Sequence, residues 1–350
     1  MRALTVVPLQ PGSAEVRDVP DPPPGDGRLL VEGLALGVCG TDREIAAGEY
    51  GWAPPGRDRL VLGHESLGRV REAPAGSGFA PGDLVVGIVR RPDPRPCPAC
   101  AHGEFDMCRN GEYTERGIKE LDGYGSQLWS VEPQFAVALD AGLAETGVLL
   151  EPASVVAKAW DQVERVGARS YFAPERVLVT GAGPIGLLAA LLGVQRGLDV
   201  HVLDRAEAGP KARAAGALGA TYHSGPVAET AERLRPDVII EATGAPPVVL
   251  DAIAGTAAYG VTCLTGVSSS GHRIPVDLGR ANRSLVLEND VVVGSVNANP
   301  RHYTAAAQAL AAADPAWLAS LITRRVPLER FAEALESRPD DIKVVLTLGS

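Results

Sequence analysis

Residues 177–204 read VLVTGAGPIGLLAALLGVQRGLDVHVLD. The stretch opens with the apolar residues 177–179, which are typical of a strand buried on both faces. Gly181, Gly183 and Gly186 then stand where a helix should begin. In such a turn the first glycine permits a tight bend, the second lets backbone N–H groups approach a pyrophosphate, and the third lets helix and strand pack closely. The stretch therefore predicts a β–α–β unit whose helix N-terminus binds a dinucleotide.

The remainder of this stretch completes the unit and indicates the nucleotide. Gly197 suits the helix end, and residues 199–203 predict a second parallel strand that ends at Asp204. Asp204 should accept hydrogen bonds from the ribose hydroxyls of NAD and repel a 2′-phosphate, which Arg205 partly offsets. We therefore predict NAD rather than NADP. The turn that holds it comprises Gly181, Gly183, Pro184, Ile185 and Gly186.

The composition of the chain sets its broad class. The 350 residues are 45% hydrophobic, with a formal net charge of −10 spread along the sequence. Scattered acids argue against a nucleic-acid or anionic-membrane partner, and no apolar run is long enough to span a bilayer. The chain start lacks the features of a secretory signal, so we expect a cytoplasmic protein. The five cysteines do not suggest a disulfide framework in that compartment, and we expect metal ligands instead.

The pattern of short apolar runs divides the chain. Residues 1–153 are rich in glycine and proline and predict an antiparallel, partly barrel-like domain. Residues 154–296 predict an α/β nucleotide-binding domain, and residues 297–350 a return to the first domain. The expected strands of the first part are 29–32, 61–62, 67–70 and 84–89; those after the β–α–β unit lie near Thr221 and at 237–241, 261–266, 291–296 and 343–348. Helices are expected at 153–166 and 300–313.

Three loops carry residues that zinc binds. Cys39 lies in GVCGTD, His64 and Glu65 in LGHE, and Glu151 in LEP. Taken alone, a cysteine beside glycine is more often a small buried apolar residue, and an acid before proline is often a helix-start signal. Together, however, thiolate, imidazole and carboxylate are the donors of a catalytic zinc that keeps one position for water or substrate.

The order of these motifs resembles the zinc-containing medium-chain dehydrogenase/reductase superfamily. It runs C-G-T-D, G-H-E, E-P and then G-x-G-P-I-G. The strings at 37–45 (GVCGTDREI), 60–68 (LVLGHESLG), 111–118 (GEYTERGI) and 294–297 (GSVN) look like the glucose 1-dehydrogenase branch. The resemblance implies a GroES-like, mainly antiparallel β catalytic domain joined to a Rossmann domain.

The resemblance also implies how the zinc is held. Cys39 and His64 would bind it, with Glu65 and Glu151 as carboxylate ligands or close partners. A thiolate and two carboxylates would make the site anionic and weaken the ion as a Lewis acid. We therefore expect only one carboxylate to coordinate at a time, while the other binds water or a substrate hydroxyl. Thr41 would pass the substrate proton towards solvent; capping its own turn is the alternative role.

Further residues are expected to touch substrate or nucleotide. By resemblance, Glu115 and Asn297 would bind the sugar, as would Thr41 and Glu151, and Asn297 would also meet the cofactor. Parallel sheets bind ligands beyond the carboxyl ends of their strands, so backbone there should contact ribose and nicotinamide. The residues at those ends are Thr243, Gly244, Gly266 and Val267.

The segment 92–108 resembles the structural zinc lobe of the superfamily, which normally offers four cysteines. Here Cys97, Cys100 and Cys108 are present, in a loop whose prolines argue against a helix. Asp93 could supply the fourth ligand, and His102 or Asp106 could do so instead. The alternative is a lobe that holds no metal.

Two departures from the glucose dehydrogenases affect the substrate. Val89 stands where relatives can place asparagine, and Leu287 and Glu288 where they place histidine. Because these changes remove groups that would read sugar hydroxyls, D-glucose itself is doubtful. We expect a zinc- and NAD-dependent dehydrogenase of an aldose, polyol or cyclitol, and by resemblance a homodimer or homotetramer. The alternatives are oxidation of another secondary alcohol, such as a hydroxy-amino acid or diol, and a catalytically silent NAD-binding protein.

Overall fold

The computed structural model describes residues 1–350 except 24, 269–273 and 350. It divides into two compact units: unit 1 comprises Met1–Ser154 and Asn297–Ser350, and unit 2 comprises Val155–Val296. The sequence places the corresponding divisions after residues 153 and 296. Among the described helices, none combines the length and the apolar character needed to cross a bilayer.

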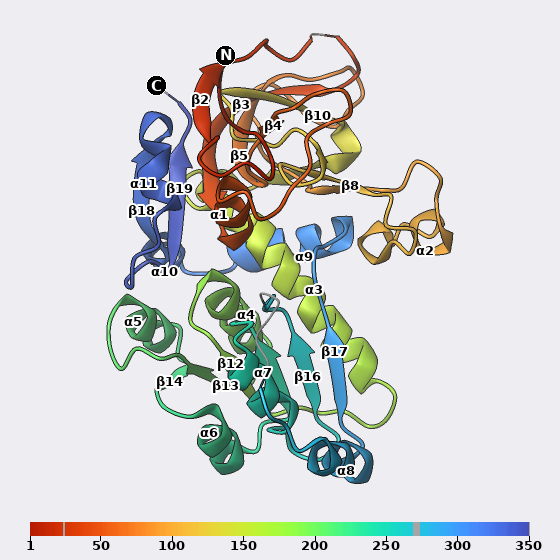
Figure 1. Ribbon diagram of the computed structural model, residues 1–350, viewed down its shortest axis with the longest axis vertical. Helices are drawn as coiled ribbons and strands as arrows, with labels where there is room; N and C mark the ends of the chain where they lie inside the picture. Colours follow the sequence, from red (N-terminus) through yellow and green to blue (C-terminus); the bar gives the residue numbers. More distant parts are fainter. Residues whose placement is uncertain (24, 269–273, 350) are drawn as a thin grey trace. The chain divides into compact units, whose positions relative to one another are not determined.

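Unit 2 is built on a parallel sheet with the strand order β14-β13-β12-β15-β16-β17 (Figure 1). Every neighbouring pair in it is parallel. The order reverses at β12, which is the point where open α/β sheets bind ligands. The strands are β12 (Arg176–Thr180), β13 (Asp199–Leu203), β14 (Thr221–His223), β15 (Val238–Glu241), β16 (Val261–Leu264) and β17 (Val291–Gly294).

The helices of unit 2 connect these strands. The first, α4 (Pro184–Gln195), is apolar nearly all round, and residues 186–193 of it are buried, as expected for a helix packed against a sheet. The expected strands 261–266 and 291–296 each end two residues early, where the chain turns at the carboxyl edge of the sheet. The other helices are α5 (Pro210–Ala217), α6 (Val227–Leu234), α7 (Pro246–Ile253) and α8 (Leu278–Glu288).

Unit 1 is mainly antiparallel, as the sequence predicts. Its largest sheet has the order β11-β6-β5-β3-β19-β18, with β10 also paired to β3 (Leu29–Val38). The others are β2-β1-β4 and β7-β8-β9. The further strands are β1 (Arg2–Val6), β2 (Glu15–Asp18), β4 (Leu60–Val61), β5 (Glu65–Glu72), β6 (Leu84–Gly87), β7 (Arg90–Arg91), β8 (Thr114–Arg116), β9 (Glu120–Leu121), β10 (Leu128–Val131), β11 (Ala136–Leu139), β18 (Ile322–Pro327) and β19 (Lys343–Thr347).

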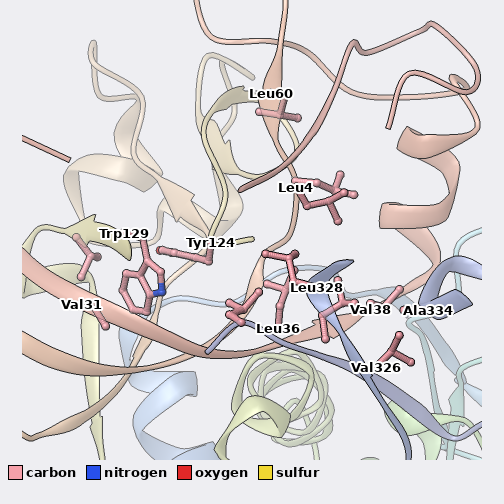
Figure 2. Packing of buried hydrophobic residues seen from close by; sticks show 14 of the residues in the cluster. Leu4, Val31, Leu36, Val38, Leu60, Tyr124, Trp129, Val326, Leu328 and Ala334 are labelled. Carbon is pink, nitrogen blue, oxygen red and sulfur yellow. The ribbon is translucent and has the colours of Figure 1, made fainter. Parts of the chain in front are cut away.

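One apolar core joins distant parts of unit 1. Leu4, Leu36 and Leu60 pack with Trp129 and with Val326 from the C-terminal segment (Figure 2). Because β19 pairs antiparallel with β3 and parallel with β18, the end of the chain lies inside the sheet begun by the N-terminal segment. The core therefore fixes the C-terminal strand beside the segment that leads to Cys39.

One of the helices in unit 1 corrects an expectation. The proline-rich loop contains α2 (Pro98–Ala101), where the sequence argues against a helix. Pro98 stands in the first helical position, which tolerates proline, and the Cys97 sulfur accepts a hydrogen bond from the Cys100 N–H. The others are α1 (Gly40–Ala46), α9 (Pro300–Ala311), α10 (Pro315–Leu321) and α11 (Phe331–Leu335); α3 (Leu150–Gly167) begins in unit 1 and continues into unit 2.

Candidate catalytic metal site

Pairing of two central strands brings Cys39 and His64 together. Cys39 follows β3 as the N-cap of α1, and His64 immediately precedes β5. Gly37 lies opposite Glu65 in the β3–β5 pair, and a Cβ at Gly37 would come within 1.9 Å of the Glu65 carboxylate. Glycine at this position therefore gives Glu65 the room to lie beside the two donors.

The donor atoms lie at distances that suit zinc. Cys39 Sγ and His64 Nε2 are 3.2 Å apart, and donor atoms of Cys39, His64 and Glu65 lie within 4.8 Å of one another. Two such ligands on one tetrahedral zinc ion would be about 3.5 Å apart, from bond lengths of about 2.3 and 2.0 Å. The donor set and its spacing thus fit the expected ion.

The electrostatics of this cluster favour a cation. Burial raises the pKa of the Cys39 thiol, although His64 opposes the shift. Burial alone would lower the pKa of His64, but Cys39 and Asp42 raise it well above its ordinary value. The Asp42 carboxylate lies 3.4 Å from His64 Nδ1, which leaves Nε2 facing Cys39. A divalent ion bound here would favour the thiolate form of Cys39. Its positive charge would also be stabilised by the same acidic side chains that raise the pKa of His64.

Lys343 is the partner of Glu65, and like Asp42, Arg90 and Lys211 it was not among the predicted site residues. Its Nζ donates a 2.6 Å hydrogen bond to Glu65 Oε1 and a 3.3 Å hydrogen bond to the Val38 carbonyl. Both side chains are almost fully buried. Lys343 comes from β19 at the far end of the chain, so only its place in the ending Asp-Ile-Lys could have drawn attention to it.

Glu151 lies near the cluster but outside it. It stands in the first turn of α3, and the set of donors within 4.8 Å does not include it. Burial raises its pKa to about 7, and Glu65 adds to this shift while His64 opposes it. The two predicted carboxylates are therefore not equivalent. The charge of Glu65 is neutralised by the buried Lys343, whereas burial disfavours the charged form of Glu151. Thr41 lies, half-buried, in the first turn of α1.

Glu115 and Asn297 meet as a pair, with Arg90 as a third member. Asn297 Nδ2 donates a 2.7 Å hydrogen bond to Glu115 Oε1. The same oxygen accepts hydrogen bonds of 3.0 and 2.8 Å from Arg90 Nε and Nη2. Asn297 has φ +62°, a conformation that asparagine tolerates better than most residues. Because one oxygen of Glu115 takes all three bonds, the group is held in one orientation.

In unit 2 the glycine turn has the predicted geometry. Gly181 has φ +92°, and a Cβ at Gly186 would come within 1.8 Å of the Gly181 carbonyl oxygen. Gly183 caps α4, and Pro184 occupies the first helical turn. Backbone N–H groups at this helix N-terminus can therefore face a pyrophosphate.

The acid at the end of β13 is tied to this turn. Asp204 Oδ2 accepts a 2.7 Å hydrogen bond from the Ala182 N–H, and Lys211 Nζ lies 3.5 Å from the same oxygen. Arg205 is exposed beside it. Burial opposes ionisation of Asp204, but the Ala182 N–H and Lys211 lower its pKa below the ordinary value. Asp204 is thus a charged hydrogen-bond acceptor beside the glycine turn, with two cations nearby.

A buried acid holds the neighbouring strand ends in place. Glu241 is fully buried, and its Oε1 accepts a 2.7 Å hydrogen bond from the Thr243 N–H. Gly244 has φ +64°, and a Cβ at Gly266 would come within 2.1 Å of the Gly244 nitrogen. Val267 is 82% exposed. The residues predicted to contact ribose and nicotinamide therefore form two adjacent turns at one edge of the sheet.

Comparison with known proteins decides the family. Residues 25–141 match the family described as Alcohol dehydrogenase GroES-like domain, and residues 144–348 match Glucose dehydrogenase C-terminus. The chain belongs to the glucose dehydrogenase branch of the zinc-containing medium-chain dehydrogenase/reductase superfamily.

Relatives of this dehydrogenase match over the whole chain. It is 40% identical over 359 residues to a Glucose 1-dehydrogenase of Methanocella arvoryzae, covering 100% of both chains. Its identity to the Glucose 1-dehydrogenase of Thermoproteus tenax is 41% over 354 residues and 99% of both. The glucose dehydrogenase of Haloferax mediterranei, solved with NADP, Zn and gluconolactone, superposes with a TM-score of 0.91 at 33% identity over 100% of both chains. The chain is thus a zinc-dependent oxidoreductase of the sugar dehydrogenase type.

The second cysteine cluster of this dehydrogenase lies in the loop around α2. The sulfurs of Cys97, Cys100 and Cys108 lie within 4.8 Å of one another. Hydrogen bonds from the backbone N–H groups of Arg109 and Cys100 lower the pKa of Cys97 to about 6, whereas burial raises that of Cys100 to about 11. One thiolate is therefore already favoured, as a metal site requires.

The structure does not bring the expected fourth donor into this cluster. The Asp93 carboxylate accepts hydrogen bonds of 2.7 Å from the Arg95 N–H and from Asn110 Nδ2. His102 Nδ1 lies 2.7 Å from the Pro98 carbonyl, and Asp106 accepts a 2.9 Å hydrogen bond from Asn299. Among the described residues only the three thiols meet, because Asp93 and His102 are engaged within the loop and Asp106 by the distant Asn299.

Proposed function

We propose that this dehydrogenase oxidises a hydroxyl of a polyhydroxylated substrate, an aldose, polyol or cyclitol, and transfers the hydride to NAD. The observation that carries the proposal is the 3.2 Å approach of Cys39 Sγ to His64 Nε2 beside a buried carboxylate. The relatives named glucose 1-dehydrogenase, and the gluconolactone bound by the Haloferax protein, support a sugar-like substrate.

The proposed zinc ligands follow from the different surroundings of Glu65 and Glu151. We propose Cys39, His64 and Glu151 as the protein ligands of the catalytic zinc. Glu65 stays paired with Lys343, so it is a partner and not a permanent ligand. When bound, zinc polarises the substrate hydroxyl and stabilises the developing negative charge.

The other residues position substrate and proton. Asp42 orients His64 through Nδ1, and its second oxygen accepts a 2.9 Å hydrogen bond from the Cys39 N–H. Thr41 would accept the substrate proton and pass it to solvent. The Glu115–Asn297 pair would bind sugar hydroxyls, since a carboxylate and an amide together both accept and donate hydrogen bonds.

The nucleotide preference is expected to be moderate. Asp204 favours NAD because its charge repels a 2′-phosphate. Lys211 and Arg205 lie close enough to offset part of that repulsion, and the Haloferax relative is solved with NADP. We therefore propose that NAD is preferred and that NADP is still used. We also propose a cytoplasmic homodimer or homotetramer.

One assay tests this function. Sugars, inositols and amino-cyclitols are each offered with NAD and with NADP, and zinc is quantified in the same preparation. We expect zinc-dependent activity on at least one of these compounds. The kcat/KM should be higher with NAD than with NADP. Activity confined to hydroxy-amino acids or simple diols would favour the other secondary-alcohol reading, and zinc-free protein that binds NADH without turnover would favour a silent binder.

A further inference from the structure

Unit 1 contains a cavity of about 820 Å³ that belongs to neither cysteine cluster. None of Cys39, His64, Glu65 and Glu151 is among the described residues that line it. Its walls come from β1, the segment after β2, the loop before β4, β8 and β10. Five arginines line it, together with the partly exposed apolar residues Leu121 and Leu128. The arginines are Arg17, Arg28, Arg57, Arg59 and Arg116.

Arg116 is the most deeply buried of these arginines. It is 5% exposed, and its guanidinium lies 5.2 Å from the ring centroid of Tyr124. Its Nη1 donates to the Asp122 carbonyl at 3.1 Å and its Nη2 to the Ser130 carbonyl at 2.9 Å. In the part of the chain that the structure describes, nothing accepts a hydrogen bond from its buried Nε. Arg116 lines the cavity together with Asp122 and Ser130, so this unsatisfied donor belongs to a side chain that borders the cavity.

Among the described residues, Arg116 has no carboxylate of its own. Glu132 lies 3.9 Å from Arg116 but closer to two other arginines, at 3.0 Å from Arg91 and 3.4 Å from Arg28, and Arg28 also lies 3.4 Å from Asp26. Burial lowers the pKa of Arg116, so its charged form would gain from a further anion. A buried charge that is not fully paired is costly, and a ligand carboxylate or phosphate would reduce that cost.

The other acids near the cavity neutralise its other cations and not Arg116. Asp122 pairs with Arg57, Glu15 with Arg59, and Asp21 lies 2.8 Å from the N-terminal amine of Met1. Asp18 and Asp58 are exposed, where solvent screens their charge. Each nearby acid is therefore either paired with a cation or at the surface.

Strand β8 separates this cavity from the sugar-binding group. Successive side chains of a strand point to opposite faces. Glu115 accordingly faces Arg90 and Asn297, whereas Arg116 faces the cavity. An occupant would thus contact different side chains from those proposed to bind the substrate.

We propose that this cavity binds a small organic anion whose carboxylate or phosphate group pairs with Arg116 and Arg28. The apolar part of the ligand lies against Leu121 and Leu128, which are partly exposed in the cavity wall. Charged hydrogen bonds from guanidinium supply most of the affinity, and the apolar wall selects ligands with a hydrocarbon or ring portion.

Calorimetry on the full chain tests this site, with saturating NAD present to occupy the nucleotide turn. The probes are benzoate, its neutral analogue benzamide, and inorganic phosphate. Benzoate is expected to bind and benzamide is not. If phosphate also binds, the anionic group alone is sufficient for binding. Arg116→Gln should weaken benzoate binding by about tenfold or more. Arg28→Gln, which changes a half-exposed side chain, should weaken it in the same direction.

Arg330→Gln is the matched control, because Arg330 is exposed, pairs only locally with Glu333 and is not among the cavity residues. It should leave benzoate binding unchanged. If Arg116→Gln fails to fold, the Arg28→Gln result decides. The proposal is overturned if no anion binds at millimolar concentration, if benzamide binds as tightly as benzoate, or if neither arginine variant changes the affinity. None of these outcomes depends on turnover, so they are independent of the proposed reaction.

Discussion

The two cysteine clusters of unit 1 are assembled in opposite ways. Cys39, His64 and Glu65 come from two paired strands, and Lys343 joins them from the last strand of the chain. Cys97, Cys100 and Cys108 come from one loop, and backbone N–H groups are the main partners that lower the pKa of Cys97. The first cluster depends on the tertiary fold and the second on local chain geometry.

This difference indicates a division of roles. The first cluster is surrounded by buried charges, namely Asp42, Lys343 and Glu151, which can tune a reactive ion. The second consists of three sulfurs, and among the described residues no carboxylate or imidazole joins them. We therefore expect changes in the first cluster to alter turnover, and changes in the second to alter only stability and metal content.

Cys39→Ser should have the largest effect. Loss of the thiolate ligand should reduce kcat by roughly a thousandfold or more, because the ion that stabilises the developing alkoxide is lost or misplaced. NADH binding, followed by fluorescence, should be nearly unchanged, since the nucleotide turn lies in unit 2. Turnover at the parent rate would show that this cluster is not the reaction centre.

Lys343→Met should destabilise the zinc-free protein by about 3–5 kcal/mol, because it leaves the buried Glu65 carboxylate without its cation. Urea unfolding measures the change. The double variant Lys343→Met with Glu65→Gln is the control, and it should recover most of the loss. No recovery would mean that Lys343 acts through packing and not through its charge.

Cys100→Ser tests the loop cluster. We expect the parent protein to contain about two zinc ions per subunit and the variant about one, with kcat unchanged. The melting temperature should fall by a few degrees, because a ligand that binds only the folded state stabilises it. A parent content of about one zinc per subunit would show instead that the loop holds no metal.

Asp290→Asn should have the smallest effect, and it supplies a pH reference in unit 2, outside both cysteine clusters. Burial raises the pKa of Asp290 to about 6, against about 3.9 in an unfolded chain. The folded state therefore holds the proton more tightly, so stability falls as pH rises from about 4 to 6. Removing the charge should raise the free energy of unfolding by less than about 1 kcal/mol at pH 7, after allowance for solvent screening, and should not change it at pH 4. Equal effects at both pH values, measured by urea unfolding, would contradict this assignment.

Much of the parallel sheet is predictable from local pattern. The β–α–β unit at 177–204 appears as β12, α4 and β13, because apolar runs, glycine turns and helix ends are all encoded by neighbours in sequence. The short helix α2 is the exception. There the prolines argue against a helix, but Pro98 occupies the one helical turn that accepts it.

The donor types in the candidate site are also predictable from the sequence, but the contacts that distinguish one donor from another are not. Sequence identifies Cys39, His64, Glu65 and Glu151, yet it does not distinguish the roles of the two acids. The distinction arises because Lys343 pairs with Glu65 and not with Glu151. Likewise Asp93 has the right chemistry for a fourth ligand, but the Arg95 N–H and Asn110 occupy its oxygens.

By itself, the sequence determined the two kinds of sheet, the nucleotide turn and the chemical types of the metal donors. These depend on the periodicity of apolar residues and on the conformations open to glycine and proline, which act over a few residues. Only the tertiary structure decided which charges face one another. Lys343 reaches Glu65, and Arg28, Arg91 and Arg116 converge on Glu132, because strands distant in the chain pair in one register. Coulomb interactions depend on distance in space and not on separation along the sequence.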